Sequence, residues 1–127
     1  MSGRAYIDSS CLVAIAFGEP GSSRLATRIR SFTTIAAHAL LEAEVRSACT
    51  REDVPVPKAE LDTIAWVEPG RTLSPEIDRV LSHGYLRGAD CWHLAIALFL
   101  SPDPRQLTFL TLDNRQRGVA RKMGFKA

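Results

Sequence analysis

The chain has 127 residues, enough for one domain with a real core and too few for two. Hydrophobic residues make up 46% and charged residues 24%, which is ordinary for a soluble globular protein. The longest apolar run, residues 94–100, is far shorter than the roughly 20 residues of a membrane span, and no pattern of a signal peptide is present. We therefore expect a single cytoplasmic domain over residues 1–127 without a membrane segment.

The charge distribution leaves the class of partner open. The net charge is +2 and the pI about 8.6, below the value of roughly 9 that marks an obvious nucleic-acid-binding domain. Basic residues are concentrated in residues 24–30 and 115–122. These two groups suit solvated helix faces as well as a rim that follows a phosphate backbone.

The cysteines indicate neither a disulfide framework nor a zinc site. Cys11, Cys49 and Cys91 form no C-x-x-C motif, and their odd number argues against paired bridges. Each lies among apolar or small residues of a predicted helix, so we expect buried, reduced thiols. Cys91 and His93 are two positions apart, which suits neither a helical ligand pair nor a zinc knuckle.

The first part of the chain alternates between short strands and helices. The β-prone residues 4–7 end at Asp8, and the apolar run that follows Ser9 and Ser10 predicts a helix over residues 11–17 with a serine cap. After a turn at residues 18–21, the pattern predicts a helix, a strand and a helix over residues 22–30, 32–36 and 37–50.

The second part continues the alternation after a proline-rich stop at residues 54–57. The pattern is weaker over residues 58–73, where we expect a helix and then an extended pair at 66–67. Later elements are a helix from Ser74, as its cap, to residue 82, a helix over 87–100, a strand over 107–112 and a helix over 115–123. Strands separated by helices predict an α/β fold, a three-layer α/β/α sandwich with a mainly parallel sheet.

Two acids are expected at one edge of this sheet. Asp8 and Asp113 each follow a predicted strand directly, and in a parallel sheet the carboxyl ends of the strands share a rim, where ligands of open α/β folds bind. Aspartate is also a common helix cap, so either residue taken alone has a structural explanation.

Glu44 and Glu42 are alternatives for a third acid on the helix over residues 37–50. Glu42 stands four positions before Arg46, the favourable order for a solvated ion pair. Glu44 lines up with the apolar Leu40 and Leu41, so it lies on or beside the buried stripe and needs a compensating group. We favour Glu44, with Glu42 left open.

Asp90 is the fourth candidate, at the start of the most apolar helix of the chain. An acid in the first turn is favoured by the helix dipole. The small and apolar residues around it nevertheless indicate that this end is packed inside the molecule. A buried acid there requires a cation or a partner such as Arg87.

Together the four acids indicate one chemistry. Clustered carboxylates are compensated most simply by a divalent cation with oxygen ligands, Mg²⁺ or Mn²⁺. Such an ion polarises a scissile phosphate, makes a water more acidic and stabilises the leaving oxygen, which suggests metal-assisted cleavage of a phosphodiester. The four candidate metal ligands and catalytic residues are Asp8, Glu44, Asp90 and Asp113.

Four stretches of the chain resemble a PIN domain, specifically a VapC-type toxin of a bacterial toxin–antitoxin pair. They are residues 6–12 (YIDSSCL), 41–48 (LEAEVRSA), 86–97 (LRGADCWHLAIA) and 109–113 (FLTLD). The resemblance implies an endoribonuclease dependent on Mg²⁺ or Mn²⁺, homodimerisation and neutralisation by a VapB-type antitoxin.

The resemblance also assigns positions within the site. The family's four acids fall on Asp8, Glu44, Asp90 and Asp113. Ser9 takes a hydroxyl position that either orients Asp8 or caps the helix. One departure stands at residue 38, where many members have Ser or Thr and this chain has a histidine. His93, one turn after Asp90, is interpreted as a packed, hydrogen-bonded side chain rather than a catalyst.

Other functions were weighed against this one. A phospho-acceptor receiver needs a second acid near the first strand and a lysine after the last, and the chain has neither. A haloacid-dehalogenase-type phosphatase needs an aspartate at position 10, where Ser10 stands. A PIN-fold RNA- or protein-binding module, with a structural divalent ion and no nuclease activity, remains the alternative.

Overall fold

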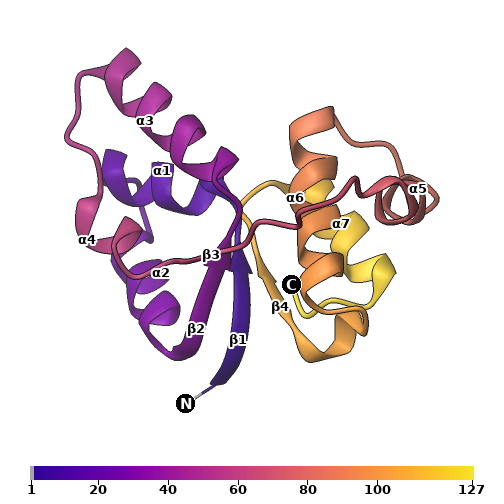
Figure 1. Ribbon diagram of the computed structural model, residues 1–127. Coiled ribbons are helices and arrows are strands. Elements are labelled where there is room, and N and C mark those ends of the chain that lie inside the picture. Colours follow the sequence, from indigo (N-terminus) through magenta and orange to yellow (C-terminus); the bar gives the residue numbers. More distant parts are fainter. Residues whose placement is uncertain (1) are drawn as a thin grey trace.

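The computed structural model describes residues 2–127 as a parallel sheet between two layers of helices (Figure 1). The elements in chain order are β1 (Ser2–Ile7), α1 (Ser9–Phe17), α2 (Ser22–Arg30), β2 (Phe32–Ala37), α3 (Leu40–Glu52), α4 (Lys58–Leu61), β3 (Ala65–Trp66), α5 (Ser74–Leu81), α6 (Gly88–Leu100), a 3₁₀ turn (Pro104–Gln106), β4 (Thr108–Leu110) and α7 (Asn114–Met123). The predicted fold class is confirmed.

The sheet has the order β3-β2-β1-β4, and every neighbouring pair is parallel. Strand β1 is central, so side chains from both of its faces are buried. Ala5 and Ile7 join the core under α1 to α4, while Tyr6 points to the core under α5 to α7. This alternation follows from the two-residue period of a strand. Figure 1 shows the two groups of helices on opposite sides of the sheet.

Helix α6 forms the centre of the second layer. Five consecutive residues, 94–98, are buried on all sides of the helix, which explains why its sequence is continuously apolar rather than striped. The first turn of α6 is less packed than the sequence predicted, because Gly88 and Ala89 are exposed and Asp90 is only partly buried.

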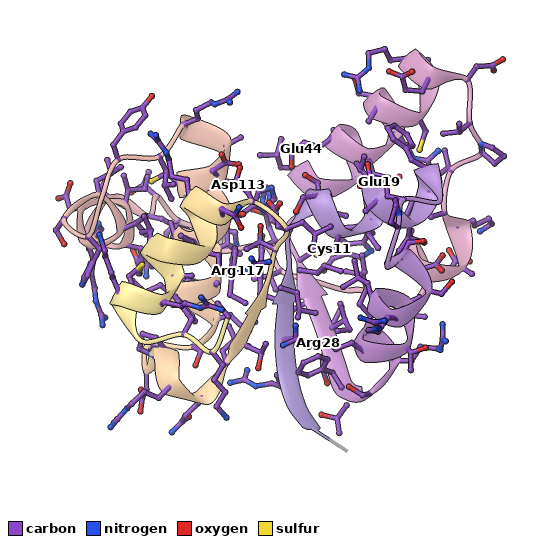
Figure 2. The ribbon with its side chains drawn as sticks, turned by 180° about the vertical axis from the view of Figure 1, so that it is seen from behind. Cys11, Glu19, Arg28, Glu44, Asp113 and Arg117 are labelled. Atoms are coloured by element: carbon purple, nitrogen blue, oxygen red, sulfur yellow. The ribbon has the colours of Figure 1, made fainter. Side chains whose placement is uncertain are left out.

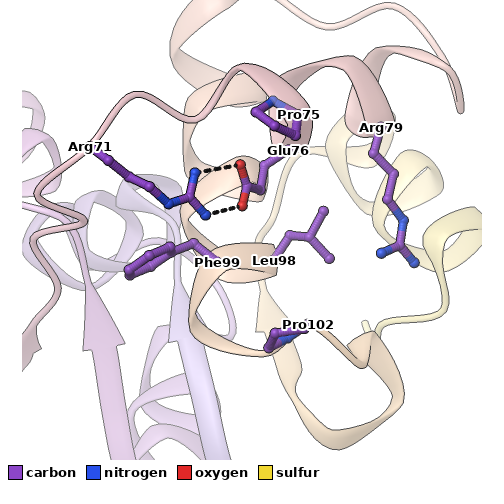
Figure 3. Close-up of a pocket in the computed structure, with 7 residues that line it drawn as sticks. All are labelled: Arg71, Pro75, Glu76, Arg79, Leu98, Phe99 and Pro102. Carbon is purple, nitrogen blue, oxygen red and sulfur yellow. Dashed lines mark hydrogen bonds and ion pairs between the residues drawn. The ribbon is translucent and has the colours of Figure 1, made fainter.

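The connection from β3 to α5 is held to α6 by one arginine (Figure 3). Both terminal nitrogens of Arg71 donate to the carboxylate of Glu76, at 3.1 and 2.5 Å. The guanidinium also lies 5.2 Å from the centre of the Phe99 ring, a cation–π distance. These two contacts attach the connection to α5 and α6, within the region of residues 58–73 for which the sequence pattern was weak.

The last strand is shorter than predicted. It ends at Leu110, because the next backbone groups bond to side chains instead of a neighbouring strand. The N–H of Leu112 donates to Ser10 Oγ (3.0 Å), and the carbonyl of Thr111 accepts from Arg117 (2.6 Å). Asp113 therefore lies at the end of a turn rather than directly after β4.

Three helix starts differ from the prediction in their cap or by more than one residue, and α6 and α7 each begin one residue from the predicted position. The cap of α1 is Asp8, whose carboxylate accepts from the N–H of Ser10, and not a serine. Helix α3 begins at Leu40 rather than residue 37, because β2 continues to Ala37. Ser74 is the first residue of α5 and does not cap it.

The expectation for the cysteines agrees with the structure. Cys11, Cys49 and Cys91 are free and buried. Within residues 2–127, no helix combines the length and hydropathy needed to cross a membrane.

Candidate active site

The four candidate acids approach the carboxyl end of the sheet from four different elements. Asp8 follows β1, Glu44 lies in the second turn of α3, Asp90 in the first turn of α6, and Asp113 caps α7. Glu44 and Asp113 come from opposite helical layers and reach the same end of the sheet (Figure 2). The fold thus brings together residues that are widely separated in the sequence.

Electrostatic coupling shows that these acids share one neighbourhood. The pKa of Asp90 is raised, first by burial and then by the negative charges of Asp8, Asp113 and Glu44, while Arg87 acts in the opposite direction. Like charges that repel at short range favour the protonated form of one of them. Negative charge is therefore in excess at this rim.

Asp8 is the most enclosed of the four, with 4% of its surface exposed. Its Oδ2 accepts from the N–H of Ser10 (3.1 Å), and its Oδ1 accepts from the amide of Gln116 (3.4 Å). Bonds to the charged form offset part of the cost of burying a carboxylate.

Gln116 is a component of the site that the sequence interpretation missed. It is fully buried; its amide nitrogen donates to Asp8 and to the carbonyl oxygen of Asp90 (3.2 Å), and its amide oxygen accepts from the Thr111 hydroxyl (2.6 Å). One side chain thereby ties together β1, α6 and the β4–α7 turn. The available signal was the spacing Asp113-x-x-Gln116, which is typical of a capping box.

Only one of the two hydrogen bonds of a capping box is present. Asp113 Oδ1 accepts from the N–H of Gln116 (2.8 Å), as the motif requires. The N–H of Asp113 donates to Thr111 Oγ1 (3.0 Å) and not to the glutamine side chain. Thr111 therefore frees the glutamine amide to turn inward toward Asp8.

Glu44 is held by a buried hydrogen-bonded chain. His93 Nε2 lies 2.6 Å from Glu44 Oε1, and His93 Nδ1 lies 2.7 Å from the hydroxyl of Tyr6. The Tyr6 hydroxyl accepts from the N–H of His38 (3.2 Å), and its pKa is raised strongly, mainly by burial. A protonated tyrosine that donates to Nδ1 leaves the proton of a neutral His93 on Nε2, facing Glu44.

The two glutamates of α3 have the environments that their spacing predicted. Glu42 pairs with Arg46 at 2.6 Å and has 41% of its side chain exposed, whereas Glu44 is partly buried, with 29% exposed, and contacts the buried His93. His93 is fully buried and hydrogen-bonded, in agreement with its interpretation as a packed side chain.

His38 has a structural role between two helices. Its Nδ1 accepts from the N–H of Leu40 (3.1 Å) and from the indole of Trp92 (3.2 Å). Leu40 is the first residue of α3 and Trp92 belongs to α6, so this one ring nitrogen of His38 connects the two helices.

A cavity of about 380 Å³ opens beside Asp90 and Asp113. Its other lining residues are Tyr85, Arg87 and Arg115. In the part of the chain that the structure describes, neither arginine forms a salt bridge within 4.0 Å. The tyrosine is 70% exposed. Carboxylates, unpaired guanidinium groups and an open aromatic ring thus meet in one cavity.

The donor set fits a hard divalent cation. All four groups are carboxylates, and Asp90 shows that their charges repel one another, which an ion would relieve. Among residues 2–127, however, no three His, Cys, Asp or Glu side chains stand close enough to share an ion. Asp8 and Glu44 are instead engaged by Gln116 and His93, so ligation requires carboxylates to turn inward. Their roles as ligands stay a prediction.

Comparison with known proteins identifies the family. The family model described as "PIN domain" matches residues 5–122. The searches of curated proteins and of solved structures gave no significant match. The matched region contains all four acids. Because the match covers most of the chain, the protein belongs to the PIN domain family.

Proposed function

We propose that this protein is a metal-dependent endoribonuclease that hydrolyses RNA phosphodiester bonds. The observation that carries the proposal is the convergence of Asp8, Glu44, Asp90 and Asp113 from four elements on one rim of the sheet. The raised pKa of Asp90, caused first by burial and then by the charges of the other three acids, agrees with it. Excess negative charge in a partly enclosed place favours a bound divalent cation.

Asp8 and Asp90 would hold Mg²⁺ or Mn²⁺, with Glu44 and Asp113 as further ligands. The ion, when bound, would polarise the scissile phosphate and lower the pKa of a water. The amide of Gln116 holds Asp8, and His93 holds Glu44. These contacts keep both carboxylates at the rim, from which they would turn toward the ion.

The adjoining cavity suits the RNA strand. Arg87 and Arg115 have no competing salt bridge among the described residues and are placed to neutralise phosphate oxygens. The exposed ring of Tyr85 offers a surface on which an unpaired base stacks.

The test is cleavage of total RNA by purified protein with Mn²⁺, with EDTA as the metal-free control. Loss of a ligand from the ion is expected to reduce cleavage by at least about a hundredfold, which is roughly 2.7 kcal/mol of activation free energy. We expect this for Asp8→Asn and Asp90→Asn, and unchanged cleavage for Glu42→Gln, an acid on α3 that pairs with Arg46. Metal-dependent cleavage retained by the double aspartate variant would end the proposal.

A second measurement separates a nuclease from a binding module that holds a structural ion. At a free Mn²⁺ concentration of about 100 times Kd, binding to the folded state adds roughly 2.7 kcal/mol to the unfolding free energy. A rise in Tm that Asp90→Asn abolishes, without any RNA cleavage, would favour the binding module.

The finer assignment is the toxin of a VapC-type toxin–antitoxin pair. It rests on the resemblance of residues 6–12 and 86–97 to that class, which also suggests a homodimer and a VapB-type antitoxin. Expression of the protein is expected to arrest bacterial growth, and expression of the Asp8→Asn variant at the same level is not. Growth that both proteins arrest equally would contradict the toxin assignment.

A further inference from the structure

A second cavity, of about 360 Å³, lies at the opposite end of the sheet from the four acids. It is formed where β1, β2 and β4 begin, together with the last turn of α2 and the segment after α7. Its lining residues are Gly3, Arg4, Arg28, Ser31, Phe32, Gln106, Thr108 and Lys126. Figure 2 shows Arg28 at this end of the sheet, far from Glu44 and Asp113.

Three of the lining residues are cations and none is an acid. In the described part of the chain, neither Arg4 nor Arg28 nor Lys126 forms a salt bridge. The nearest acid in sequence to this lining, Asp103, is held at two oxygens by Arg105, which lowers its pKa. No lining residue of the cavity therefore compensates its positive charge.

The acids of the candidate active site do not compensate it either. Arg4 and Asp8 are four residues apart on one strand, which corresponds to about 13 Å at roughly 3.3 Å per residue. Charges in solvent are largely screened beyond about 8 Å at physiological ionic strength. The three cations that line this cavity are exposed, and an anion bound there would pair with them.

We propose that this cavity binds a phosphate group. Guanidinium groups match phosphate oxygens through paired hydrogen bonds, and lysine adds a compact charge. Gln106 and Thr108 add polar groups to the lining, and the half-buried Phe32 provides an apolar wall. The volume lies near the lower end of the range for ligand pockets, about 300–1,000 Å³, which suits a mononucleotide unit.

The phosphate has two sources, a free mononucleotide or the backbone of an RNA strand. The phosphate of either one would pair with the same three cations. The proposal does not depend on nuclease activity, because the cavity shares no residue with the candidate active site.

Binding of inorganic phosphate and of AMP to the full chain, measured by calorimetry in EDTA, tests the proposal. We expect saturable binding that the double variant Arg4→Gln/Lys126→Gln weakens at least about tenfold. The matched control, Arg24→Gln/Lys122→Gln, removes the same charge from exposed positions outside the cavity and keeps the parental affinity. Absence of saturable binding, or equal weakening in both double variants, overturns the proposal.

A second arm separates the two sources and guards against a misfolded variant. Affinity for a short single-stranded RNA in EDTA falls with Arg4→Gln/Lys126→Gln if the backbone is the ligand, and the salt slope becomes shallower by about 1.4. Unchanged RNA affinity with weakened AMP binding identifies the free nucleotide. If the double variant unfolds, the NMR chemical shifts of the backbone amides of Gln106 and Thr108 are followed while phosphate is added to the parent protein. We expect these shifts to change, and constant shifts refute the site.

Discussion

Replacement of Gln116 by leucine tests whether this amide holds the candidate active site together. The substitution removes the donor to Asp8 Oδ1 and to the carbonyl of Asp90, and the acceptor of the Thr111 hydroxyl. A buried polar group left without its partner costs about 1–3 kcal/mol. The contact with Asp8 is long at 3.4 Å, and the Thr111 hydroxyl keeps two other partners, the N–H of Asp113 at 3.0 Å and Ser10 Oγ at 3.4 Å. We therefore expect a total loss of roughly 2–5 kcal/mol.

This loss is a large fraction of the 5–15 kcal/mol by which domains are typically stable. For a chain of this length it corresponds to a drop in Tm of roughly 6–20 °C. Urea and thermal unfolding followed by circular dichroism measure it. The control is Gln106→Leu, which changes an exposed glutamine and is expected to stay within about 0.5 kcal/mol of the parent. If Gln116→Leu is as stable as this control, the amide does not perform the role assigned to it.

Three further outcomes follow from the same geometry. The pKa of Asp90 is raised in the folded protein, so its negative charge destabilises the metal-free fold once the pH exceeds the pKa of the unfolded chain, and fully above the folded pKa. Asp90→Asn should therefore raise Tm at pH 7 but not at pH 3. An equal Tm of variant and parent at pH 7 would contradict the repulsion. Burial raises the pKa of Cys11 to about 12, so its thiol should resist iodoacetamide at pH 8 until the protein is unfolded, and mass spectrometry of the native protein would reveal any exception. Tyr85→Ala should weaken binding of single-stranded RNA in EDTA by about 1–3 kcal/mol, while Tyr85→Phe keeps it; a matched loss in the phenylalanine variant would argue against stacking.

Local sequence patterns were sufficient for much of the fold. Helix α2 has the bounds that its pattern predicted, and the separate roles of Glu42 and Glu44 followed from the spacing of helix faces. Such features depend on neighbours within about four residues, which the sequence displays directly. The alternation of strands and helices determined the parallel sheet in the same way.

The ends of the elements were less accessible, because distant side chains decided them. β4 stops at Leu110 since Ser10, which is 102 residues away from Leu112 in the sequence, takes the hydrogen bond that another strand would have provided. The cap of α1 is instead a local feature, because Asp8 follows β1 in an extended conformation and presents its carboxylate to the N–H of Ser10, two residues further on.

The sequence by itself determined the class of fold, the family and the four candidate acids. Only the tertiary structure decided what holds those acids, because the partners are remote: Gln116 lies 108 residues from Asp8, and His93 lies 49 from Glu44. A buried glutamine or histidine has no periodic signature of its own. Its role emerges only when packing removes water and leaves one polar group within reach of another.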